Sequence, residues 1–275
     1  MFEGSSIAAV LPFVKQRKHV FRVLTQPPLT QSLGPWFSDE QTPTLSAQHR
    51  LLGALEEELP SAHAYQQNWM PDISNWLPFY WAGYSQMTRY TYRLDLTVTD
   101  ESLWQHLESQ CRGAFRKATN RNRLSVDVSW DVDEFFRMNS AVFKRQGQDV
   151  PYSRMLVDRI IQEGSKRDAV TLFVARDPSG NAHASGVVVR DVDRCYYLLG
   201  GTSADYRNSG GMNLILWHAI LDARARGQRI FDFEGSMNQS IEKFFRSFGA
   251  AQTPYSRVWK YHNRALRQMM RFKGK

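Results

Sequence analysis

Two carboxylates in the last fifth of the sequence have the spacing of residues that could move a proton. In Phe231-Asp-Phe-Glu-Gly235, Asp232 and Glu234 alternate with two phenylalanines. If this segment is a strand, both carboxylates lie on one face and both rings on the other. A carboxylate at a strand end can act as a general base, directly or through water, and Glu234 is our candidate. The alternative is a carboxylate that caps a turn or pairs with an arginine, and for Asp232 this alternative is at least as good.

A second segment could bind an anion. Arg207-Asn-Ser-Gly-Gly211 follows an apolar segment and opens a helical pattern. A loop that enters a helix N-terminus presents free backbone N–H groups and the positive end of the helix dipole, which suits a phosphate. The residues expected to bind such a group are Arg207, Ser209, Gly210 and Gly211. The alternative is an ordinary glycine-rich helix start.

The charge balance also favours an anionic partner. The 275 residues include 35 Lys or Arg and 27 Asp or Glu, a formal charge of +8. Such a surplus suits a nucleotide, tRNA or a pyrophosphate lipid, although solubility alone is an equal explanation. Stretches without acidic residues lie at 111–126 and 243–275. In the first, Arg112 and Arg116 share one helical face, and Lys117 and Arg121 form a second stripe. Such stripes could follow a tRNA backbone or an acidic acceptor, or remain a solvated face.

Several classes of protein have no support in the sequence. Only two cysteines occur, Cys111 and Cys195, and the seven histidines are scattered, so neither a disulfide framework nor a metal site is expected. The longest apolar run, 7–14, is too short to span a membrane and lacks the basic start of a signal peptide. We therefore expect a soluble, cytoplasmic protein.

The second half of the sequence predicts an ordered series of strands and helices. The expected strands are 123–130, 170–176, 184–190, 195–199, 229–235 and 252–260, and the expected helices are 132–145, 152–163, 211–226 and 240–247. Asp131 and Glu134 have the spacing of a capping box, and Gly227 can end the third of these helices. Gly200 and Gly201 are expected to break the strand before them.

The first half of the sequence predicts a partial repeat of this order of strands and helices. A hairpin is expected from 7–14 and 21–24, followed by a helix at 46–59, an aromatic segment at 73–84, a strand at 89–98 and one long helix at 100–119. The partial repeat suggests a duplicated unit whose first strand and helices are missing. We therefore expect either a shortened protein or a sequence whose N-terminal start is incomplete. The aromatic cluster around 69–84 is expected to form a core or a wall, with a substrate groove as the minority interpretation.

Three segments carry a resemblance to a known superfamily. They are Cys111-Arg-Gly-Ala-Phe-Arg-Lys-Ala118, Phe231-Asp-Phe-Glu-Gly-Ser-Met237 and Ile241-Glu-Lys-Phe-Phe-Arg-Ser-Phe-Gly249 with Pro254-Tyr255 after it. Together with the element order, they resemble the GNAT acyltransferases, near the Fem-type (FemAB-like) peptidyltransferases. The likeness covers most of residues 90–262 and is strongest at 231–260.

The resemblance implies an α/β (α+β) GNAT fold, with a mixed, mainly antiparallel sheet flanked by helices. It implies a partial GNAT-like unit with a connecting helix at 1–120, a complete GNAT acyltransferase domain at 121–262 and a basic tail at 263–275. It also implies transfer of an acyl group from acyl-CoA (acetyl-CoA) to an amine acceptor, without a metal. Two alternatives stay open: a Fem-type enzyme that uses aminoacyl-tRNA to extend a cell-wall precursor, and a non-catalytic basic binding module.

The resemblance also assigns roles to residues around the donor. The GNAT pyrophosphate loop follows the pattern Gln/Arg-x-x-Gly-x-Gly/Ala, which 207–211 match, although Met212 departs at the last position. Gly200, Gly201 and Thr202 are expected beside the thioester, where a splayed strand could expose N–H groups to the oxyanion. A tight loop is an equally good explanation of the two glycines.

The remaining roles concern the acceptor and the leaving group. Glu234 would deprotonate the amine, while Asp232, Ser236 and Asn238 would contact the substrate. Arg246 would neutralise charge on the leaving group or hold a phosphate, and its alternative is a solvated cation at a helix end. Tyr255 would protonate a leaving thiolate, although a tyrosine in a strand is more often a packing residue.

Overall fold

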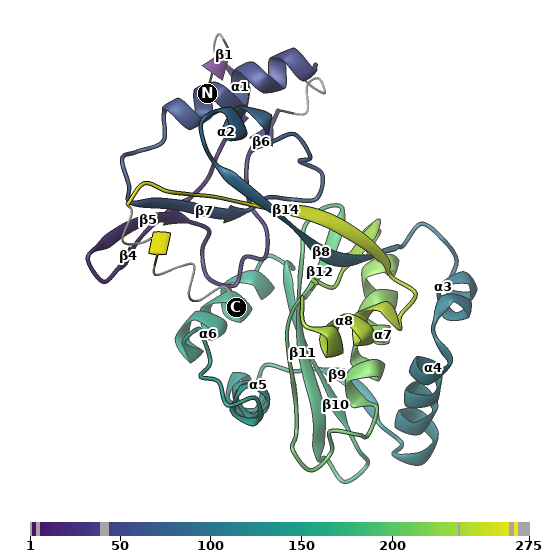
Figure 1. The fold of residues 1–275 in the computed structure, drawn as a ribbon. Helices are drawn as coiled ribbons and strands as arrows, with labels where there is room; N and C mark the ends of the chain where they lie inside the picture. Colours follow the sequence, from purple (N-terminus) through teal and green to yellow (C-terminus); the bar gives the residue numbers. More distant parts are fainter. Residues whose placement is uncertain (1, 4–5, 39–43, 236, 264–266, 269–275) are drawn as a thin grey trace. The chain divides into compact units, whose positions relative to one another are not determined.

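The computed structural model describes residues 2–3, 6–38, 44–235, 237–263 and 267–268. Its contacts divide the chain into two compact units (Figure 1). Unit 1 comprises Met1–Tyr90 and Thr253–Lys275, and unit 2 comprises Thr91–Gln252. This division differs from the boundaries at 120 and 262 that the sequence suggested, because the helices before residue 120 pack into unit 2 and the last strand leaves it.

Unit 2 is a mixed α/β domain. Its helices are α3 (Asp100–His106), α4 (Ser109–Arg116), the π-helical turn η1 (Lys117–Arg121), α5 (Val132–Arg145), α6 (Arg154–Ser165), α7 (Gly211–Ala225) and α8 (Gln239–Arg246). Its strands are β9 (Ser125–Val128), β10 (Val170–Arg176), β11 (Ala182–Arg190), β12 (Arg194–Thr202) and β13 (Ile230–Asp232), with the end of β8 (Ser85–Asp95). The strand order is β8-β13-β12-β11-β10-β9. Of these pairs, β12 with β13 is parallel and the others are antiparallel, which confirms the expected fold class.

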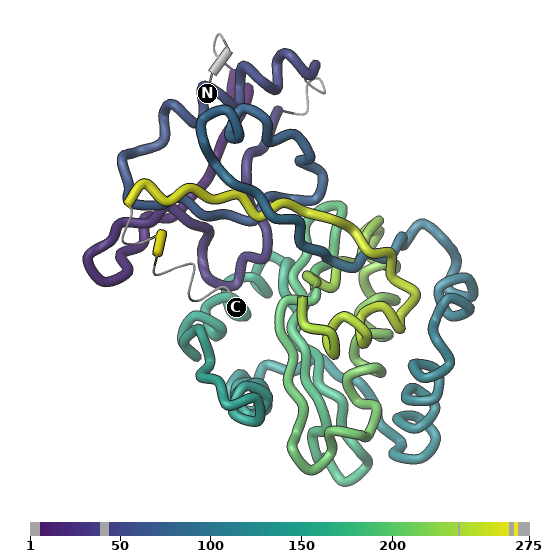
Figure 2. The backbone as a smooth tube through the Cα atoms, in the orientation of Figure 1, coloured from purple at the N-terminus to yellow at the C-terminus, as the bar shows by residue number. Residues whose placement is uncertain are grey.

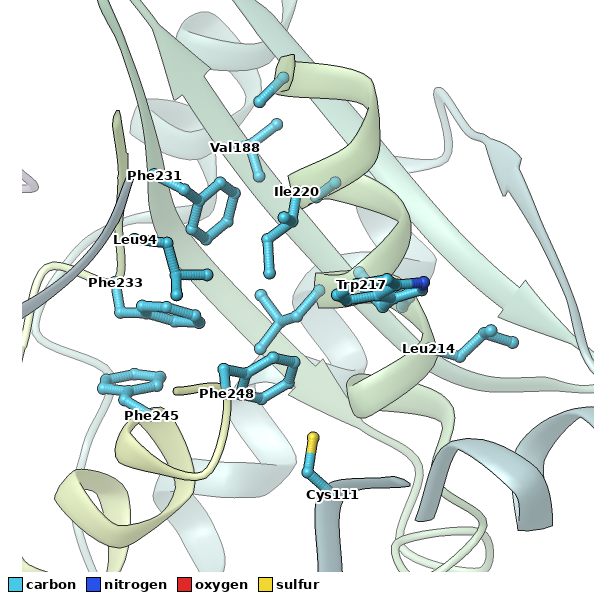
Figure 3. Close-up of a cluster of buried hydrophobic side chains, with 14 of the residues drawn as sticks. Leu94, Cys111, Val188, Leu214, Trp217, Ile220, Phe231, Phe233, Phe245 and Phe248 are labelled. Carbon is cyan, nitrogen blue, oxygen red and sulfur yellow. The ribbon is translucent and has the colours of Figure 1, made fainter. Parts of the chain in front are cut away.

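The helices of unit 2 cover its sheet on both faces. Figure 1 shows α5 and α6 on one side of β9 to β12 and α7 on the other, and the trace in Figure 2 follows the chain through these layers. Helix α7 is apolar on most sides because strands cover one face while α3 and α4 cover the other, where Trp104 meets Trp217 with ring centroids 5.3 Å apart. In the core, Phe233 lies between Phe231, Phe245 and Phe248 (Figure 3).

Local sequence signals account for several helix boundaries in unit 2. The side chain of Asp131 accepts a 2.8 Å hydrogen bond from the backbone N–H of Glu134, which confirms the predicted cap of α5. After α7, Gly227 has a φ of +86°, a left-handed conformation that glycine adopts at no steric cost and that ends a helix. These boundaries depend on residues within one turn of the helix end, which is why the sequence predicts them.

The single long helix predicted at 100–119 is wrong. The chain forms α3 and α4 instead, with Leu107 between them in an extended conformation, and then the π-helical turn η1. At the break, the N–H of Glu108 donates to the carbonyl of Ser247 at 2.8 Å, and Gly249 packs directly on His106. Contacts with the segment after α8, far away in the sequence, therefore interrupt the helix.

Unit 1 contains its own hydrophobic core. Its helices are α1 (Leu45–Glu57) and α2 (Leu77–Trp81), and its strands are β1 (Phe2–Glu3), β2 (Ser6–Ile7), β3 (Ala9–Val10), β4 (Val14–Lys18), β5 (Phe21–Thr25), β6 (Trp36–Phe37), β7 (Ala64–Asn68), the start of β8 and most of β14 (Ala251–Tyr261). The main strand order is β4-β5-β7-β14-β8. Leu52, Trp69 and Phe79 are fully buried, whereas Tyr80 and Trp81 are exposed, so the aromatic cluster is only partly a core.

The hairpin predicted from 7–14 and 21–24 is also wrong in its first arm. Strand β5 pairs with β4, so the charged residues Lys15–Lys18 are strand and not turn. The short strand β3 pairs with β6 instead. Because β4 is the last strand in its sheet, its polar side chains face solvent, and the apolar periodicity used for the prediction is missing there.

In the described part of the chain, no helix has both the length and the apolar character needed to cross a membrane.

Candidate active site

Two parallel strands separate in the middle of unit 2. Strands β12 and β13 pair only where Arg194–Tyr196 face Ile230–Asp232. Beyond this point β13 ends, while β12 continues to Thr202 and pairs with β11 alone among the described strands. The β11–β12 register also shifts here, since Val187 faces Leu199 and Val188 faces Tyr197, leaving Leu198 as an extra residue. A bulge beside an open strand edge exposes backbone groups to a ligand.

Gly200 and Gly201 do not break β12, so that prediction is wrong. A methyl group on Gly201 would lie 2.5 Å from the backbone nitrogen of Asn139, because α5 packs directly on the strand. The carbonyl of Gly200 accepts a 2.8 Å hydrogen bond from the Asn139 side chain, and the hydroxyl of Tyr197 lies over this glycine. Both glycines thus allow close packing, and Thr202 accepts a 3.2 Å hydrogen bond from Arg145.

The loop 207–211 opens α7 as the sequence predicts. Gly210 is the N-cap residue, with a φ of +85°, and the Ser209 hydroxyl accepts a 3.2 Å hydrogen bond from the N–H of Gly211. One side of the loop is covered, because Gly210 packs on the backbone of Ala114 in α4. Arg207 is exposed. Gly211 is buried and packs on His183 and Ala184 of β11, so the start of α7 is held between α4 and the sheet.

Glu234 lies just beyond the end of β13. The strand predicted over 229–235 stops at Asp232, and Glu234 has a left-handed φ of +57°, so strand alternation does not orient its side chain. The side chain is half-buried, and its carboxylate receives no hydrogen bond from the residues that the structure describes. Burial, followed by the negative charge of Asp232, raises the pKa of Glu234 well above its ordinary value. Glu234 is therefore a carboxyl group that holds its proton at a higher pH than usual.

Asp232 is buried and fully engaged. One carboxylate oxygen accepts hydrogen bonds from the Thr91 hydroxyl at 2.5 Å and from the N–H of Glu234 at 2.8 Å. The other oxygen forms an ion pair with Arg93 at 2.7 Å. This residue thus joins β8 to β13 and fixes the backbone of Glu234. Thr91 and Arg93 escaped the sequence analysis because they lie about 140 residues away, and no local pattern marks them.

The other candidates lie in different surroundings. Arg246 forms 2.9 Å ion pairs with Glu242 and with Glu108. Asn238 caps α8, because its side chain accepts a 3.0 Å hydrogen bond from the N–H of Ser240. Ser236 lies outside the described residues. The structure therefore brings Asp232 and Glu234 together at the end of β13.

Tyr255 belongs to unit 1. Its hydroxyl accepts hydrogen bonds from Gln31 at 2.9 Å and from Arg89 at 3.1 Å. Unit 1 thus contains both of these donors, and the pairing fits the packing alternative that the sequence left open for this tyrosine.

Comparisons with known proteins agree with this architecture. The structure of FemX matches with a TM-score of 0.69 and 12% identity, covering 93% of this chain and 86% of that one. The L-PGS structure from Bacillus licheniformis matches with a TM-score of 0.59 and 11% identity, over 96% and 84% of the two chains. The C-terminal domain of a lysylphosphatidylglycerol synthetase from Agrobacterium fabrum gives a TM-score of 0.56 and 15% identity, over 98% and 85%. At these identities the likeness concerns the fold alone.

Sequence comparisons lead to a family. A search of curated protein sequences found no match. The family model described as an acetyltransferase (GNAT) domain matches residues 105–270, which is more than half of the chain. This region includes the separated strands, the loop that opens α7 and the Asp232–Glu234 pair. The chain therefore belongs to the GNAT acetyltransferase-domain family.

Proposed function

We propose that this protein is an N-acyltransferase that moves an acyl group from acyl-CoA to an amine, with Glu234 as the general base. Membership of the GNAT family supports acyl transfer in general. The observation that carries the proposal is the position of Glu234 where β12 and β13 separate, together with its raised pKa. The acceptor is an amine-bearing molecule, and a cytoplasmic location remains part of the proposal.

A raised pKa suits this role. An amine must lose a proton when its nitrogen attacks a thioester carbonyl, and the efficiency of a base is best when its pKa lies near the working pH. Glu234 would accept this proton, directly or through one water, as the C–N bond forms. The C–S bond then breaks and the thiolate of CoA takes up a proton as it leaves. Asp232 would act by holding the backbone of Glu234 and by raising the pKa of the Glu234 carboxyl group.

The donor would lie along the open edge of β12 and reach the start of α7. The bulge at Leu198 could present backbone groups to the thioester, beside Gly200, Gly201 and Thr202. The loop with Arg207, Ser209, Gly210 and Gly211 could bind the pyrophosphate through the N-terminal end of α7. Arg246 would then add positive charge near the leaving group.

A second candidate is aminoacyl transfer from tRNA. The observation that favours it is the convergence of Lys117, Arg121 and Arg123 on one cavity beside the loop that opens α7. Basic side chains on a helical stripe can follow an RNA backbone, and such binding weakens steeply with salt. A cell-wall precursor would then be the acceptor.

The first experiment measures thermal stability with CoA, acetyl-CoA and longer acyl-CoAs, and separately with aminoacyl-tRNA. A ligand that binds the folded state must raise the melting temperature. We expect stabilisation by the CoA species. Stabilisation by tRNA alone, lost at high salt, would replace the donor with aminoacyl-tRNA.

The second experiment tests Glu234→Gln with the donor that binds. We expect turnover to fall about 10²- to 10⁴-fold, because the base is lost, while donor binding persists. The matched control is Glu163→Gln, which removes an exposed carboxylate of α6 and should leave turnover unchanged. Full activity of Glu234→Gln would disprove the role of this carboxylate. Loss of activity in this variant, with folding intact, would exclude the non-catalytic binding module.

A further inference from the structure

A second candidate site lies in unit 2, at the end of the sheet where α7 begins. A cavity of about 470 Å³ is formed by η1 and the residues after it, the turn between β10 and β11, and the loop 205–209. This volume is within the range of sites that take small organic ligands. The cavity walls are mainly polar, so an apolar ligand would not suit them.

Three cations from one short segment line this cavity. They are Lys117, Arg121 and Arg123, and none of their side chains has a hydrogen-bond or ion-pair partner among the described residues. The π-helical geometry, with the N–H of Asn122 bonded to the carbonyl of Lys117 at 3.0 Å, brings Lys117 and Arg121 to the same side. Arg123 adopts a left-handed φ of +48°. Single π-helical turns and left-handed non-glycine residues are both concentrated at functional sites.

The residues that line the cavity also include a buried histidine. His183 is only 4% exposed, and its ring is stacked on Tyr206 with centroids 3.9 Å apart. One ring nitrogen, Nε2, lies 3.3 Å from a carboxylate oxygen of Asp177. The other, Nδ1, is buried without a hydrogen-bond partner among the described residues. Because buried polar atoms are nearly always bonded, this nitrogen is an exception close to the cavity, in a residue that lines it.

Two carboxylates also line the cavity, and they differ in their surroundings. Asp177 accepts hydrogen bonds from Asn181, Ser179 and His183, which compensate its charge within the turn. Asp205 is exposed and lies in the loop before α7. Three unpaired cations beside one compensated and one exposed carboxylate favour an anionic ligand that also carries hydroxyl groups, since carboxylates accept hydrogen bonds from hydroxyls.

We propose that this cavity binds a phosphate monoester of a sugar, either a free sugar phosphate or a nucleoside monophosphate. Lys117, Arg121 and Arg123 would bind the phosphate. Asp205 would accept hydrogen bonds from sugar hydroxyls, and the Tyr206 side of the cavity would contact the rest of the ligand. Of the residues that line the cavity, only Ser209 belongs to the site proposed for acyl-CoA, so the binding does not rest on that donor. Lys117, Arg121 and Arg123 are also the residues that would follow tRNA in the second candidate function, and the RNA probe below separates the two ligands.

The test measures binding by titration calorimetry at constant ionic strength, without any acyl donor. The probes are AMP, ribose 5-phosphate, adenosine and a short single-stranded RNA. We expect at least one of the two phosphate monoesters to bind and adenosine not to bind. Binding of both would identify a sugar phosphate as the minimal ligand, whereas binding of AMP alone would add the base.

Variants then locate the site. Lys117→Ala and Arg121→Ala should each weaken binding of the phosphate monoester about tenfold, since each removes a charged donor of a hydrogen bond. The matched control is Arg116→Ala, which removes an exposed charge one position before Lys117 but outside the cavity lining. Binding by Glu234→Gln should equal that of the unmodified protein, so a failure of the proposed function would not affect this result.

Three outcomes would overturn the proposal. In the first, neither phosphate monoester binds. In the second, Arg116→Ala weakens binding as much as Arg121→Ala does, which would indicate that diffuse surface charge attracts the ligand. In the third, only the RNA binds and Lys117→Ala weakens it, which would identify a face for nucleic acid.

Discussion

At the residue scale, the site depends on two neighbouring carboxyl groups with different tasks. Asp232 is buried and bonded to Thr91, Arg93 and the backbone of Glu234. Glu234 is half-buried, and its pKa is raised by burial and by the charge of Asp232. Two acidic groups with different surroundings can therefore divide the work, one holding the backbone and one exchanging the proton.

Replacing Asp232 should change both stability and pH dependence. Asp232→Asn removes the charge of a buried carboxylate that is paired with the partly buried Arg93, and we expect it to lower the free energy of unfolding by about 3 kcal/mol. It also removes a negative charge that raises the pKa of Glu234, so the acidic limb of the kcat/KM profile should move to lower pH. Urea unfolding and a pH series measure the two effects. Asp133→Asn, which breaks an exposed ion pair with Arg154, is the control and should change neither.

The raised pKa of Glu234 also predicts how stability varies with pH. Above the ordinary value of 4.5, the unfolded chain ionises this group while the folded chain keeps its proton. The group therefore favours folding at low pH, and this contribution is lost as the pH rises to the raised pKa of the folded state. The unfolding free energy of Glu234→Gln relative to the unmodified protein should rise over this window and level off above it. A difference that is constant with pH would contradict the raised pKa.

At the element scale, the packing of α5 on β12 keeps the open strand edge in place. The helix comes so close that its backbone at Met138 and Asn139 leaves no room for a side chain at Gly201. The same helix bonds to the carbonyl of Gly200 through Asn139. The bulged half of β12, which loses β13 as a neighbour, is thus supported from one face by a helix.

Two glycine substitutions distinguish the effect of this contact on stability from the general effect of replacing a glycine by alanine. Gly201→Ala should lower the free energy of unfolding by about 1–3 kcal/mol, because the new methyl group forces α5 away from the strand. Gly113→Ala, in α4 where nothing lies within 4 Å, should raise it by about 0.5–1 kcal/mol through helix propensity. Chemical denaturation of both variants measures the effect. An unchanged stability for Gly201→Ala would show that α5 can move at little cost.

At the scale of the whole molecule, two units with separate cores are built from three stretches of the chain. The core of unit 2 is formed between Tyr92 and Ala250, within one continuous segment. The core of unit 1 combines residues from the first 84 positions with Val258 of β14, which is fully buried. Unit 1 is therefore completed only when β14 has been made.

Fragments of the chain should show that unit 2 can fold from one continuous segment and that unit 1 cannot. Residues 91–252 should fold alone with one cooperative thermal transition, because their core is complete. Residues 1–90 alone should stay unfolded, since β14 lies between β7 and β8 in their sheet. Joining residues 253–263 to residue 90 through a flexible linker should restore folding. Circular dichroism and calorimetry measure all three, and a folded 1–90 fragment would show that β14 is dispensable.

The sequence by itself determined the elements whose ends depend on neighbouring residues. The strand Val170–Arg176 has the predicted bounds, α5 begins at the predicted cap Asp131, and α7 begins at Gly211 as predicted. The fold class was implied by the resemblance to the GNAT family, to which the order of these elements contributed. The sequence also identified Glu234 and the loop 207–211 as candidates by residue type, because an acidic strand end and a glycine-rich helix start are local patterns.

Only the tertiary structure decided where strands end and which residues meet. Strand β13 stops at Asp232, whose carboxylate is bonded to Thr91 and Arg93 of β8 and to the N–H of Glu234. Glu234 then adopts a left-handed conformation. The break at Leu107 likewise depends on the segment after α8. The raised pKa of Glu234, the packing at Gly201 and the cavity at Lys117 arise from contacts between distant segments. No local pattern encodes such contacts, because burial and pairing exist only once the chain has folded.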